Sequence, residues 1–540
     1  MKAKPMPRRL PWSALLFAVP LAAQQADRLE SLKREAVADI DRRATFTQQL
    51  VDQLFSYGEL GFQETETSKT LTALLRKNGF TVEEGVAGMP TAWVATWGSG
   101  KPVIMLGSDL DGIPRASQRP GVACHSPLVE GAPGHGEGHN SGQAVNLTAA
   151  LAIKKLMERE HLSGTIKLWP GVAEELLAGK AYLVRAGVFK EADAVLFSHV
   201  GDNFDTSWGE AYGTGLVSVL YSFRGRAAHA AGAPWAGRSA LDAAELMDIG
   251  WNFRREHLRL AQRSHSVIRD GGDQPNVVPS NATTWYYLRE LDYDHIKGLW
   301  AVADSVAMGA ALMTGTTLLP TRIVGSAWPR YFDRPLAEAV SANIKRVGLP
   351  TWTAEDQRLA RAVQSEVGAD TSGLATRLDS LQGPAEDNQG GPSDDIGDVA
   401  WSVPTAILYY PANIPNLPGH HWADAIAMAT PIAHKGSTAG AKVVAMTLLD
   451  LLLRPALVDS ARTWFDSVQT KDTKYQSFLR AGDAPATEFN QATMARFRDS
   501  MRKFYYDPAK YPTYLAQLGI KYPTLRGDAG SGCGTGSEAH

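Results

Sequence analysis

The chain has 540 residues, too many for one ordinary domain and enough for two or three. Hydrophobic residues make up 44% of it and charged residues 21%, the proportions of a globular protein with a substantial core. Its 54 basic residues nearly balance 57 acidic ones, for a net charge of -3, so we expect no nucleic-acid partner.

The first 23 residues have the layout of a secretory signal peptide. The segment begins with a basic head that contains Lys2, Lys4, Arg8 and Arg9. An apolar run, PWSALLFAVPLAA, follows and ends in small residues before Gln24. We therefore expect cleavage near Ala23 and export of a bacterial protein to the periplasm or the medium. The alternatives are an uncleaved anchor and a wrongly assigned start, but the run is short for a membrane span, and we expect no later segment to be apolar enough for a stable one.

Residues 26–215 are predicted to form the first part of a catalytic domain. Helical patterns at 65–77 and 141–160 alternate with strand-like runs, which are TAWVATWG, PVIMLGSDL, TIKLWPGVA and AVLFSHV. This alternation predicts an α/β fold with a mainly parallel sheet flanked by helices. In such sheets, ligands bind beyond the carboxyl ends of the strands.

Residues 216–328 depart from this order. Patterns for strand, helix, two strands, helix and strand follow one another, which is the ferredoxin-like α+β arrangement. We expect a separate lid or dimerisation domain inserted into the first domain. Residues 329–455 then return to the catalytic domain, with a core strand at 401–412 and a helix at 436–453. The remainder, 456–540, is predicted to be a helical, aromatic-rich appendage with a flexible tail.

The chain has two cysteines, Cys124 and Cys533, so its scaffold is not built on disulfides. Cys533 lies in the glycine-rich tail. A single bridge and two separate free thiols are both compatible with the sequence.

Side chains suited to metal chemistry follow the predicted strands. TIKLWPGVAEE ends in Glu174 and Glu175, and AVLFSHV contains His199. The loops GHGEGHN, at 134–140, and PGHHW, at 418–422, add further histidines and a glutamate. One glutamate can hold a metal while its neighbour takes the proton from an attacking water. Each segment alone has an ordinary structural explanation, but together they indicate a metal-dependent hydrolase.

A series of segments along residues 28–453 resembles, in the same order, the aminoacylase / carboxypeptidase G family of metallopeptidases and amidohydrolases. These segments are YGELGFQETETS, SDLDGIP, GHGEGHN, VAEE, FSHV, GRAAHAAGAPWAGRSALDA, PNVVPSNA, SDDIGDVAW, PGHHW and PIAHKGSTAGAKVVA. The resemblance is greatest to the amidohydrolase branch that includes p-aminobenzoyl-glutamate hydrolase. It implies a two-zinc exopeptidase-like catalytic domain with an inserted lid that often dimerises.

The resemblance also implies roles for individual residues. Glu174 would be the general base, and the lid residue His229 would stabilise the tetrahedral intermediate, in some members from the partner subunit. Asn276, also on the lid, would contact the substrate. The implied metal ligands are Glu137, His139, Glu175, His199 and His420. His421 is the rival of His420 within the same histidine pair.

Glu137 departs from the pattern of the branch, which usually has cysteine there. A carboxylate keeps the negative charge but is a harder ligand than a thiolate, which moves preference from zinc towards manganese. We expect two divalent metal ions, Zn or Mn, with Glu137 as a ligand; the alternative is loss of the second metal. Asp109 and Asp111 stand where peptidase branches carry a His-x-Asp ligand motif, and we expect them to orient the ligand histidines.

The sequence thus predicts an exported amidohydrolase that cleaves the amide bond of N-acyl amino acids or p-aminobenzoyl-glutamate-like compounds. Arg289, on a lid strand, is a candidate partner for the substrate carboxylate, although a structural ion pair explains it equally well. One alternative is a dipeptidase or aminopeptidase of the same family, which Asp109 in place of histidine disfavours. Another is a non-catalytic binding subunit. The expected partners are a small-molecule amide and a second copy of the chain, bound through the lid, or a different subunit.

Overall fold

The computed structural model describes residues 18–528 and 532–533. The predicted signal peptide, residues 1–23, lies outside the described residues except for backbone from Ala18 onward. That backbone begins helix α1 (Ala18–Arg42).

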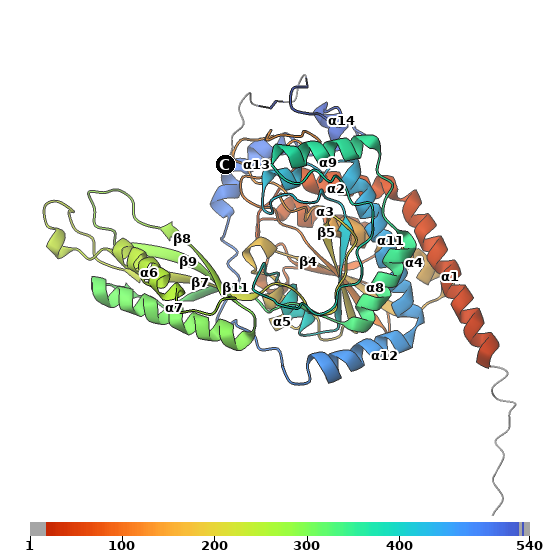
Figure 1. Cartoon of the computed structure of the whole chain (residues 1–540), viewed down its shortest axis with the longest axis horizontal. Coiled ribbons are helices and arrows are strands. Elements are labelled where there is room, and N and C mark those ends of the chain that lie inside the picture. The colour runs from red at the N-terminus through yellow and green to blue at the C-terminus, as the bar shows by residue number, and fades with distance from the viewer. Residues whose placement is uncertain (1–17, 529–531, 534–540) are drawn as a thin grey trace, which may run out of the picture.

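A six-stranded sheet forms the centre of the catalytic domain, in the order β1-β2-β4-β3-β5-β13 (Figure 1). Its strands are β1 (Thr81–Glu84), β2 (Trp93–Ser99), β3 (Val103–Asp109), β4 (Gly164–Gly171), β5 (Ala194–Gly201) and β13 (Thr405–Pro411). The last four in the sheet order run parallel, while β1 and β2 are antiparallel at one edge. Every residue of β3 is buried, because both faces of the parallel part are covered.

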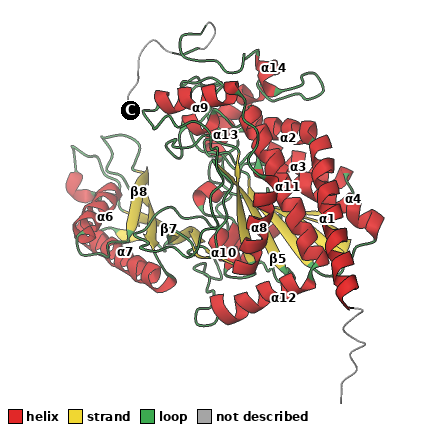
Figure 2. Ribbon diagram, turned by 45° about the vertical axis from the view of Figure 1, so that its right-hand side comes forward, coloured by secondary structure: helices red, strands yellow, loops and turns green. Residues whose placement is uncertain are grey.

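The two faces of the sheet belong to different apolar cores. Along β3, Ile104 and Leu106 pack into one cluster and Met105 into the other, as the alternating pleat requires. Long helices cover the first face (Figure 2), namely α1, α2 (Ala44–Tyr57), α4 (Gly142–Glu160), α8 (Arg334–Val347) and α11 (Pro431–Leu453). The remaining helices of the domain are α3 (Thr65–Lys77), α5 (Lys180–Arg185), α9 (Ala354–Glu366) and α10 (Ile396–Ala400). The second core includes α5 and α10 and continues into the lid.

The lid is an antiparallel sheet with two helices, and it extends away from the catalytic domain (Figure 1). Its elements are β7 (Gly215–Arg224), α6 (Ala240–Arg255), β8 (Arg263–Asp270), β9 (Asn281–Glu290), α7 (Tyr293–Thr314), β10 (Thr317–Leu318) and β11 (Arg322–Ala327). β11 and β10 pair with β7, which is followed by β9 and β8, the ferredoxin-like order. A short pair, β6 (Gly209–Glu210) with β12 (Tyr331–Phe332), flanks the lid in the sequence. The predicted fold class is confirmed.

The appendage passes from one end of the catalytic domain to the other. Its first helix, α12 (Pro455–Trp464), lies at the base in Figure 1, and α13 (Gln491–Arg502) and α14 (Tyr514–Leu518) lie at the top. Apart from the short helical turn η6 (Phe465–Gln469), the intervening chain contains no helix or strand. Beyond α14, Cys533 forms a disulfide with Cys124. The sequence allowed either one bridge or two free thiols, and the structure contains the bridge.

Two helices among the described residues, α7 and α11, are long and apolar enough by composition to cross a membrane. Our expectation that no segment after the signal peptide has such apolarity is therefore wrong. In α11, 83% of the most apolar window is buried inside the catalytic domain, which accounts for its composition. α7 packs one face on the lid sheet. The absence of a stable membrane span stays a prediction.

Two glycines test how tightly the chain is packed, one in the central sheet and one in lid helix α7. A Cβ atom at Gly107, in β3, would come within 2.2 Å of the ring of Trp169, which is fully buried. We expect Gly107→Ala to lower the free energy of unfolding by about 1–3 kcal/mol through overpacking. Gly298, inside α7, has no atom within 4 Å of its Cβ position, so Gly298→Ala should raise stability by up to about 1 kcal/mol. Urea unfolding measures both, and equal effects of the two substitutions would contradict this packing.

Candidate metal centre

Loops at the carboxyl ends of the parallel strands bring the five predicted metal ligands together. Glu137 and His139 precede α4, Glu175 lies in the turn η3 (Glu174–Leu176) after β4, His199 lies near the end of β5, and His420 precedes η5 (Trp422–Ala425). Ligand atoms of Glu137, His139, Glu174 and Glu175 lie within 4.8 Å of one another. The two glutamates of the VAEE segment therefore meet the histidine loop at one point.

Distances within this group suit shared cations. His139 Nε2 lies 3.3 Å from His199 Nε2 and 3.8 Å from Glu137 Oε2. His420 Nε2 lies 3.1 Å from Glu137 Oε2 and 3.3 Å from Glu175 Oε2. The other oxygen of Glu137, Oε1, is 3.5 Å from His199 Nε2. The two oxygens of Glu137 thus face three imidazoles, as a bridging ligand requires.

The orientation of two rings shows that a cation fits. His139 Nδ1 lies 3.1 Å from the backbone oxygen of Asp111, and His199 Nδ1 lies 2.8 Å from that of Val200. Each Nδ1 therefore carries the ring proton, and each Nε2 presents a lone pair to the centre. A hydrogen bond between these two nitrogens, 3.3 Å apart, needs a proton on one of them. A divalent cation accepts both lone pairs, with the neighbouring carboxylates as counter-charges.

The surrounding charges favour a cation at this position. Burial acts to lower the pKa of His139, but Asp111, Glu137 and neighbouring carboxylates outweigh it and raise the pKa well above its ordinary value. The hydrogen bond with Glu137 raises the pKa of His420 to about 9. Protons and metal ions therefore compete for these nitrogens.

The geometry favours His420 over its neighbour as the ligand. His421 Nδ1 accepts a hydrogen bond from the backbone N–H of Ala423 at 3.3 Å, which caps η5. Its ring packs on Trp422, with ring centroids 4.8 Å apart. His421 thus has a local structural role, while the side chain of His420 reaches two carboxylates of the centre.

Two buried carboxylates hold the turn that carries Glu174 and Glu175. The backbone at Ala173 adopts a left-handed conformation, with φ 53°. Glu64 Oε1 accepts from the N–H of Ala173 at 2.8 Å, and the two oxygens of Asp111 accept from the N–H groups of Glu174 and Glu175 at 3.1 Å. Burial, followed by repulsion from Asp111, raises the pKa of Glu64 to about 8. These hydrogen bonds hold the turn in a strained backbone conformation, and the side chains of the two glutamates point in different directions from it.

A buried lysine lies beneath this turn. Lys180 Nζ is 2.6 Å from Asp109 Oδ1, 2.5 Å from Asp395 Oδ1 and 3.4 Å from Asp394 Oδ1. All four side chains are at most a tenth exposed. Burial, followed by repulsion from Asp394, raises the pKa of Glu174 well above its ordinary value, although Lys180 opposes the shift. A carboxylate with a raised pKa accepts a proton readily, as a general base must.

Sequence reasoning assigned no role to Glu64, Lys180, Asp394 or Asp395. Glu64 and the two aspartates lie in the segments YGELGFQETETS and SDDIGDVAW, so the resemblance pointed to their neighbourhoods without giving their contacts. Lys180 carries no local signal, because only the folded chain places it beside three aspartates.

The lid contributes Arg289 beside the centre. Its Nη1 donates to Ser393 Oγ at 2.7 Å, and its guanidinium lies 5.4 Å from the ring centroid of Tyr287. Its buried Nε has no hydrogen-bond partner among the described residues. Burial lowers the pKa of Arg289, while the charges of Tyr287 and Glu174 oppose that shift.

His229 and Asn276 lie together at the other end of the lid. His229 forms a bridge with Val277, and the N–H of Ala230 donates to the backbone oxygen of Asn276 at 3.0 Å. Both loops adjoin the end of the lid sheet where Arg224 pairs with Asn281, whereas Arg289 is at the opposite end. Ten strand residues span about 33 Å. Within one chain, His229 and Asn276 are therefore remote from Glu174.

A pocket of about 310 Å³ opens beside Glu175 and His420, a size suited to small molecules. Trp285 and Tyr287 of β9 form its aromatic side. Other lining residues are Leu60, Gly61, Gly112, Ile113, Pro114, Leu176 and Asn490. The catalytic domain, the lid and the appendage all contribute to this wall.

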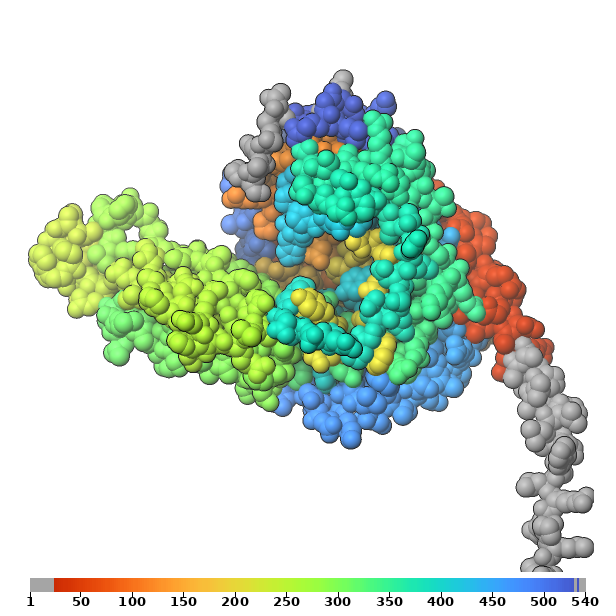
Figure 3. Space-filling view, in the orientation of Figure 1, coloured from red at the N-terminus to blue at the C-terminus, as the bar shows by residue number. Residues whose placement is uncertain are grey.

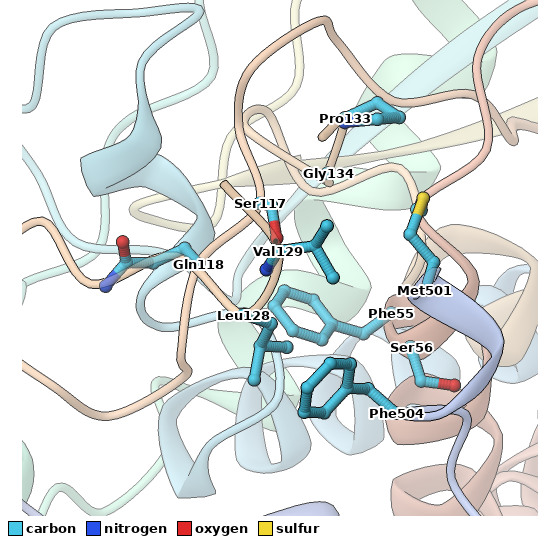
Figure 4. A pocket seen from close by; sticks show the side chains of 11 residues that line it. Phe55, Ser56, Ser117, Gln118, Leu128, Val129, Pro133, Gly134, Met501 and Phe504 are labelled. Carbon is cyan, nitrogen blue, oxygen red and sulfur yellow. Dashed lines mark hydrogen bonds between the residues drawn. The ribbon is translucent and has the colours of Figure 1, made fainter. Parts of the chain in front are cut away.

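A second, smaller cavity lies where the appendage packs on the catalytic domain (Figure 4). Phe55 and Ser56 of α2 face Met501 and Phe504 across it, beside the loop that leads to the ligands. Its volume of about 20 Å³ holds a single water, and no metal-binding side chain lines it. It is a packing seam.

Comparison with known proteins agrees with this geometry. No family model matches the chain. Over 452 residues it is 32% identical to a subunit of the p-aminobenzoyl-glutamate hydrolase of Escherichia coli, and the match covers 79% of this chain and 92% of that protein. The chain belongs to this family of metallopeptidases and amidohydrolases. It is accordingly a hydrolase that acts on amide bonds.

Two further matches place the chain within the family. The mouse Xaa-Arg dipeptidase is 29% identical over 82% of this chain and 93% of its own length. The solved structure of an aminobenzoyl-glutamate utilization protein from Klebsiella pneumoniae matches with a TM-score of 0.53 and 18% identity, over 77% of this chain and 96% of that one. The structural match supports the fold.

The histidine pair provides a direct test of the ligand assignment. We expect His420→Ala to remove about one divalent ion per chain, because this imidazole faces Glu137 and Glu175. His421→Ala is the matched control and should leave the metal content unchanged. Elemental mass spectrometry on metal-loaded, desalted protein measures both. Loss of metal in the His421 variant alone would reverse the assignment.

Proposed function

We propose that the chain is an exported metal-dependent amidohydrolase that cleaves the amide bond of N-acyl amino acids or p-aminobenzoyl-glutamate-like compounds. The observation that carries this proposal is the convergence of three imidazoles and two carboxylates next to the buried Glu174. A pocket of small-molecule size opens directly beside this group.

Two divalent metal ions, Zn or Mn, are the proposed cofactors. His139 and His199 offer nitrogen ligands, and Glu137 offers one oxygen facing each of these two histidines. Glu175 and His420 complete the set on the pocket side. A carboxylate at position 137 favours the harder ion, so manganese is the first metal to try.

The residues of the chain divide the work of amide hydrolysis. Bound divalent ions supply an activated water and polarise the amide carbonyl. Glu174 takes the proton of the attacking water and returns it to the nitrogen of the leaving amine. Asp111 and Glu64 keep Glu174 in place through the turn, and Lys180 limits the negative charge beneath it.

Arg289 is the proposed anchor for a substrate carboxylate. Its Nε is buried and unpaired among the described residues, and an unpaired buried donor is costly unless a ligand satisfies it. The nearby hydroxyl of Ser393 holds the guanidinium in place. Both N-acyl amino acids and p-aminobenzoyl-glutamate carry such a carboxylate.

A homodimer through the lid would complete the site. The lid projects from the catalytic body (Figure 3), and its edge strand β8 pairs only with β9 among the described residues. Large apolar side chains are exposed on β8 and on both lid helices, namely Val267, Ile268, Phe253, Met308 and Leu312. An unpaired edge with apolar neighbours invites a second copy. The partner's His229 would then reach the oxyanion that the chain's own His229 cannot.

A different partner chain is the alternative. The relatives at 32% and 26% identity are named as two different subunits of the Escherichia coli p-aminobenzoyl-glutamate hydrolase, so both subunits of that enzyme resemble this chain. Size measurement of the purified chain alone separates the two possibilities.

Export is supported by two features. The N-terminal pattern is that of a signal peptide. The bridge between Cys124 and Cys533 is of a kind that persists in oxidising compartments such as the periplasm.

Dipeptide hydrolysis is the second candidate function. The similarity to the Xaa-Arg dipeptidases favours it, since a dipeptide also presents an amide and a carboxylate. Asp109, where peptidase branches carry a histidine, pairs with Lys180. A panel of N-acyl amino acids and free dipeptides distinguishes the two functions.

The role of Glu174 predicts a selective loss. Glu174→Gln should lower kcat by at least about 100-fold, because the amide cannot accept the proton, while metal content and melting temperature stay close to wild type. Glu130→Gln, at an exposed position of the loop before the centre, is the matched control and should keep full activity. Steady-state kinetics with p-aminobenzoyl-glutamate test the pair. A fully active Glu174 variant would refute the mechanism.

A shared site predicts complementation between two inactive chains. His229→Ala and Glu174→Gln chains should each be nearly inactive alone, but a dimer of one with the other has one intact site. In a randomly mixed equimolar population, half the dimers are mixed and half of their sites are intact, so activity should recover to about a quarter of wild type. The measurement is activity after unfolding and refolding the two chains together. No recovery in a mixture shown to contain mixed dimers would exclude a site shared across the lid.

A further inference from the structure

The appendage reaches the pocket through one short segment, residues 484–490, here called the strap. Asn490 ends it in a left-handed conformation, with φ 63°, and lines the pocket beside Glu175 and His420. Its Nδ2 donates to the backbone oxygen of Gly61 at 3.1 Å. Among the described residues no donor reaches its Oδ1. One polar atom at the pocket wall is therefore available to a ligand.

The strap also supports the aromatic side of the pocket. Phe489 is 3% exposed, and its ring packs edge-on against Trp285, with centroids 5.2 Å apart. The guanidinium of Arg269 covers Phe489 at 3.6 Å. Trp285 is further held by a hydrogen bond from its Nε1 to Ser218 Oγ at 2.8 Å. The position of Trp285 in the pocket thus depends on a residue of the appendage.

Contacts on both sides fix the strap between the two domains. On the lid side, Glu488 pairs with Arg322. On the catalytic side, Gln63 Nε2 donates to the backbone oxygens of Thr487 and Phe489, each at 3.0 Å. Gly61, which Asn490 holds, packs so tightly on Ala173 that a Cβ atom there would lie 2.9 Å from its Cα. The strap is therefore tied to the turn that carries the catalytic glutamates.

We propose that the strap is the selectivity wall of the substrate pocket, with Asn490 contacting the acyl group of the substrate and Phe489 positioning Trp285. This rests on the proposed amidohydrolase function. The pocket beside the metal ligands has Trp285 and Tyr287 on its aromatic side, and Ile113 and Pro114 are among its other apolar residues. It takes an aromatic acyl group, and the free Oδ1 of Asn490 accepts from a hydrogen-bond donor on that ring. The preferred substrate class is an aromatic acyl amino acid whose ring carries an amino or hydroxyl substituent.

Asn490→Gly tests the polar contact, because glycine keeps the left-handed backbone and removes the side chain. We expect kcat/KM for p-aminobenzoyl-glutamate to fall about 10-fold, the effect of one lost hydrogen bond, while benzoyl-glutamate and acetyl-glutamate change less than about two-fold. Asn78→Gly is the matched control, since Asn78 Nδ2 also donates to a backbone oxygen, that of Leu74 at 2.8 Å, away from the pocket. Equal losses for all three substrates would overturn the proposal.

Phe489→Ala tests the positioning role. With Trp285 released, KM should rise several-fold for both aromatic substrates but not for acetyl-glutamate, while kcat stays near wild type. Phe489→Leu, which restores apolar bulk behind Trp285, should recover part of the loss. A fall in kcat for every substrate would instead indicate general disruption and count against the proposal.

Binding of the product acids separates this proposal from the hydrolase function. Calorimetry should show that wild type binds p-aminobenzoate about 10-fold more tightly than benzoate, and that Asn490→Gly removes the difference. A wild type that hydrolyses none of the panel but retains this difference refutes the proposed function and supports the selectivity wall. Equal affinities for the two acids in wild type overturn the wall, whatever the turnover.

Discussion

An excess of buried negative charge at the ends of the parallel strands is the constraint on which the rest of the site depends. The carboxylates gathered there are Glu64, Asp109, Asp111, Glu137, Glu174, Glu175, Asp394 and Asp395. Three cationic side chains interact electrostatically with these carboxylates, namely Lys180, Arg330 and Arg289. Isolated buried carboxylates are costly, so the remaining charge is removed by protonation or balanced by imidazolium groups or metal ions. The negative potential that makes burial of these carboxylates costly in the absence of cations also favours the binding of cations there.

The strained turn after β4 follows from this charge. A left-handed alanine persists only where its surroundings over-determine it, and here two carboxylates accept from three consecutive N–H groups. The turn directs Glu175 towards His420 and places Glu174 beside Asp394 and Asp395, the two aspartates that pair with Lys180. Two adjacent residues with the same side chain thereby acquire different surroundings, one suited to a metal ligand and the other to a base. Their division of labour comes from the turn.

The sequence was sufficient for the fold class and for the residues that the folded chain gathers at the centre. Strand and helix periodicity is local and predicts the parallel sheet, whereas the ligand residues were assigned through the resemblance of their segments to the family. Lys180, Glu64 and Asn490 could not be found in this way. Each of them contacts a residue that is more than a hundred positions away in the sequence, and no local pattern encodes such a contact. The structure favours His420 over His421, because His420 faces Glu137 and Glu175 whereas His421 caps η5.

The geometry of the lid also limits how the site can be completed. The near end of β9 contacts the site, since Tyr287 Oη lies 3.5 Å from the backbone oxygen of Glu175. His229 lies beyond the far end, where β9 begins at Asn281, about 20 Å along the strand from Tyr287. Rotation about the near end keeps that radius unchanged, so lid closure within one chain cannot deliver His229 to Glu174. In the proposed homodimer a second chain would supply this histidine, and the strap holds the near end of the lid in place on the catalytic domain.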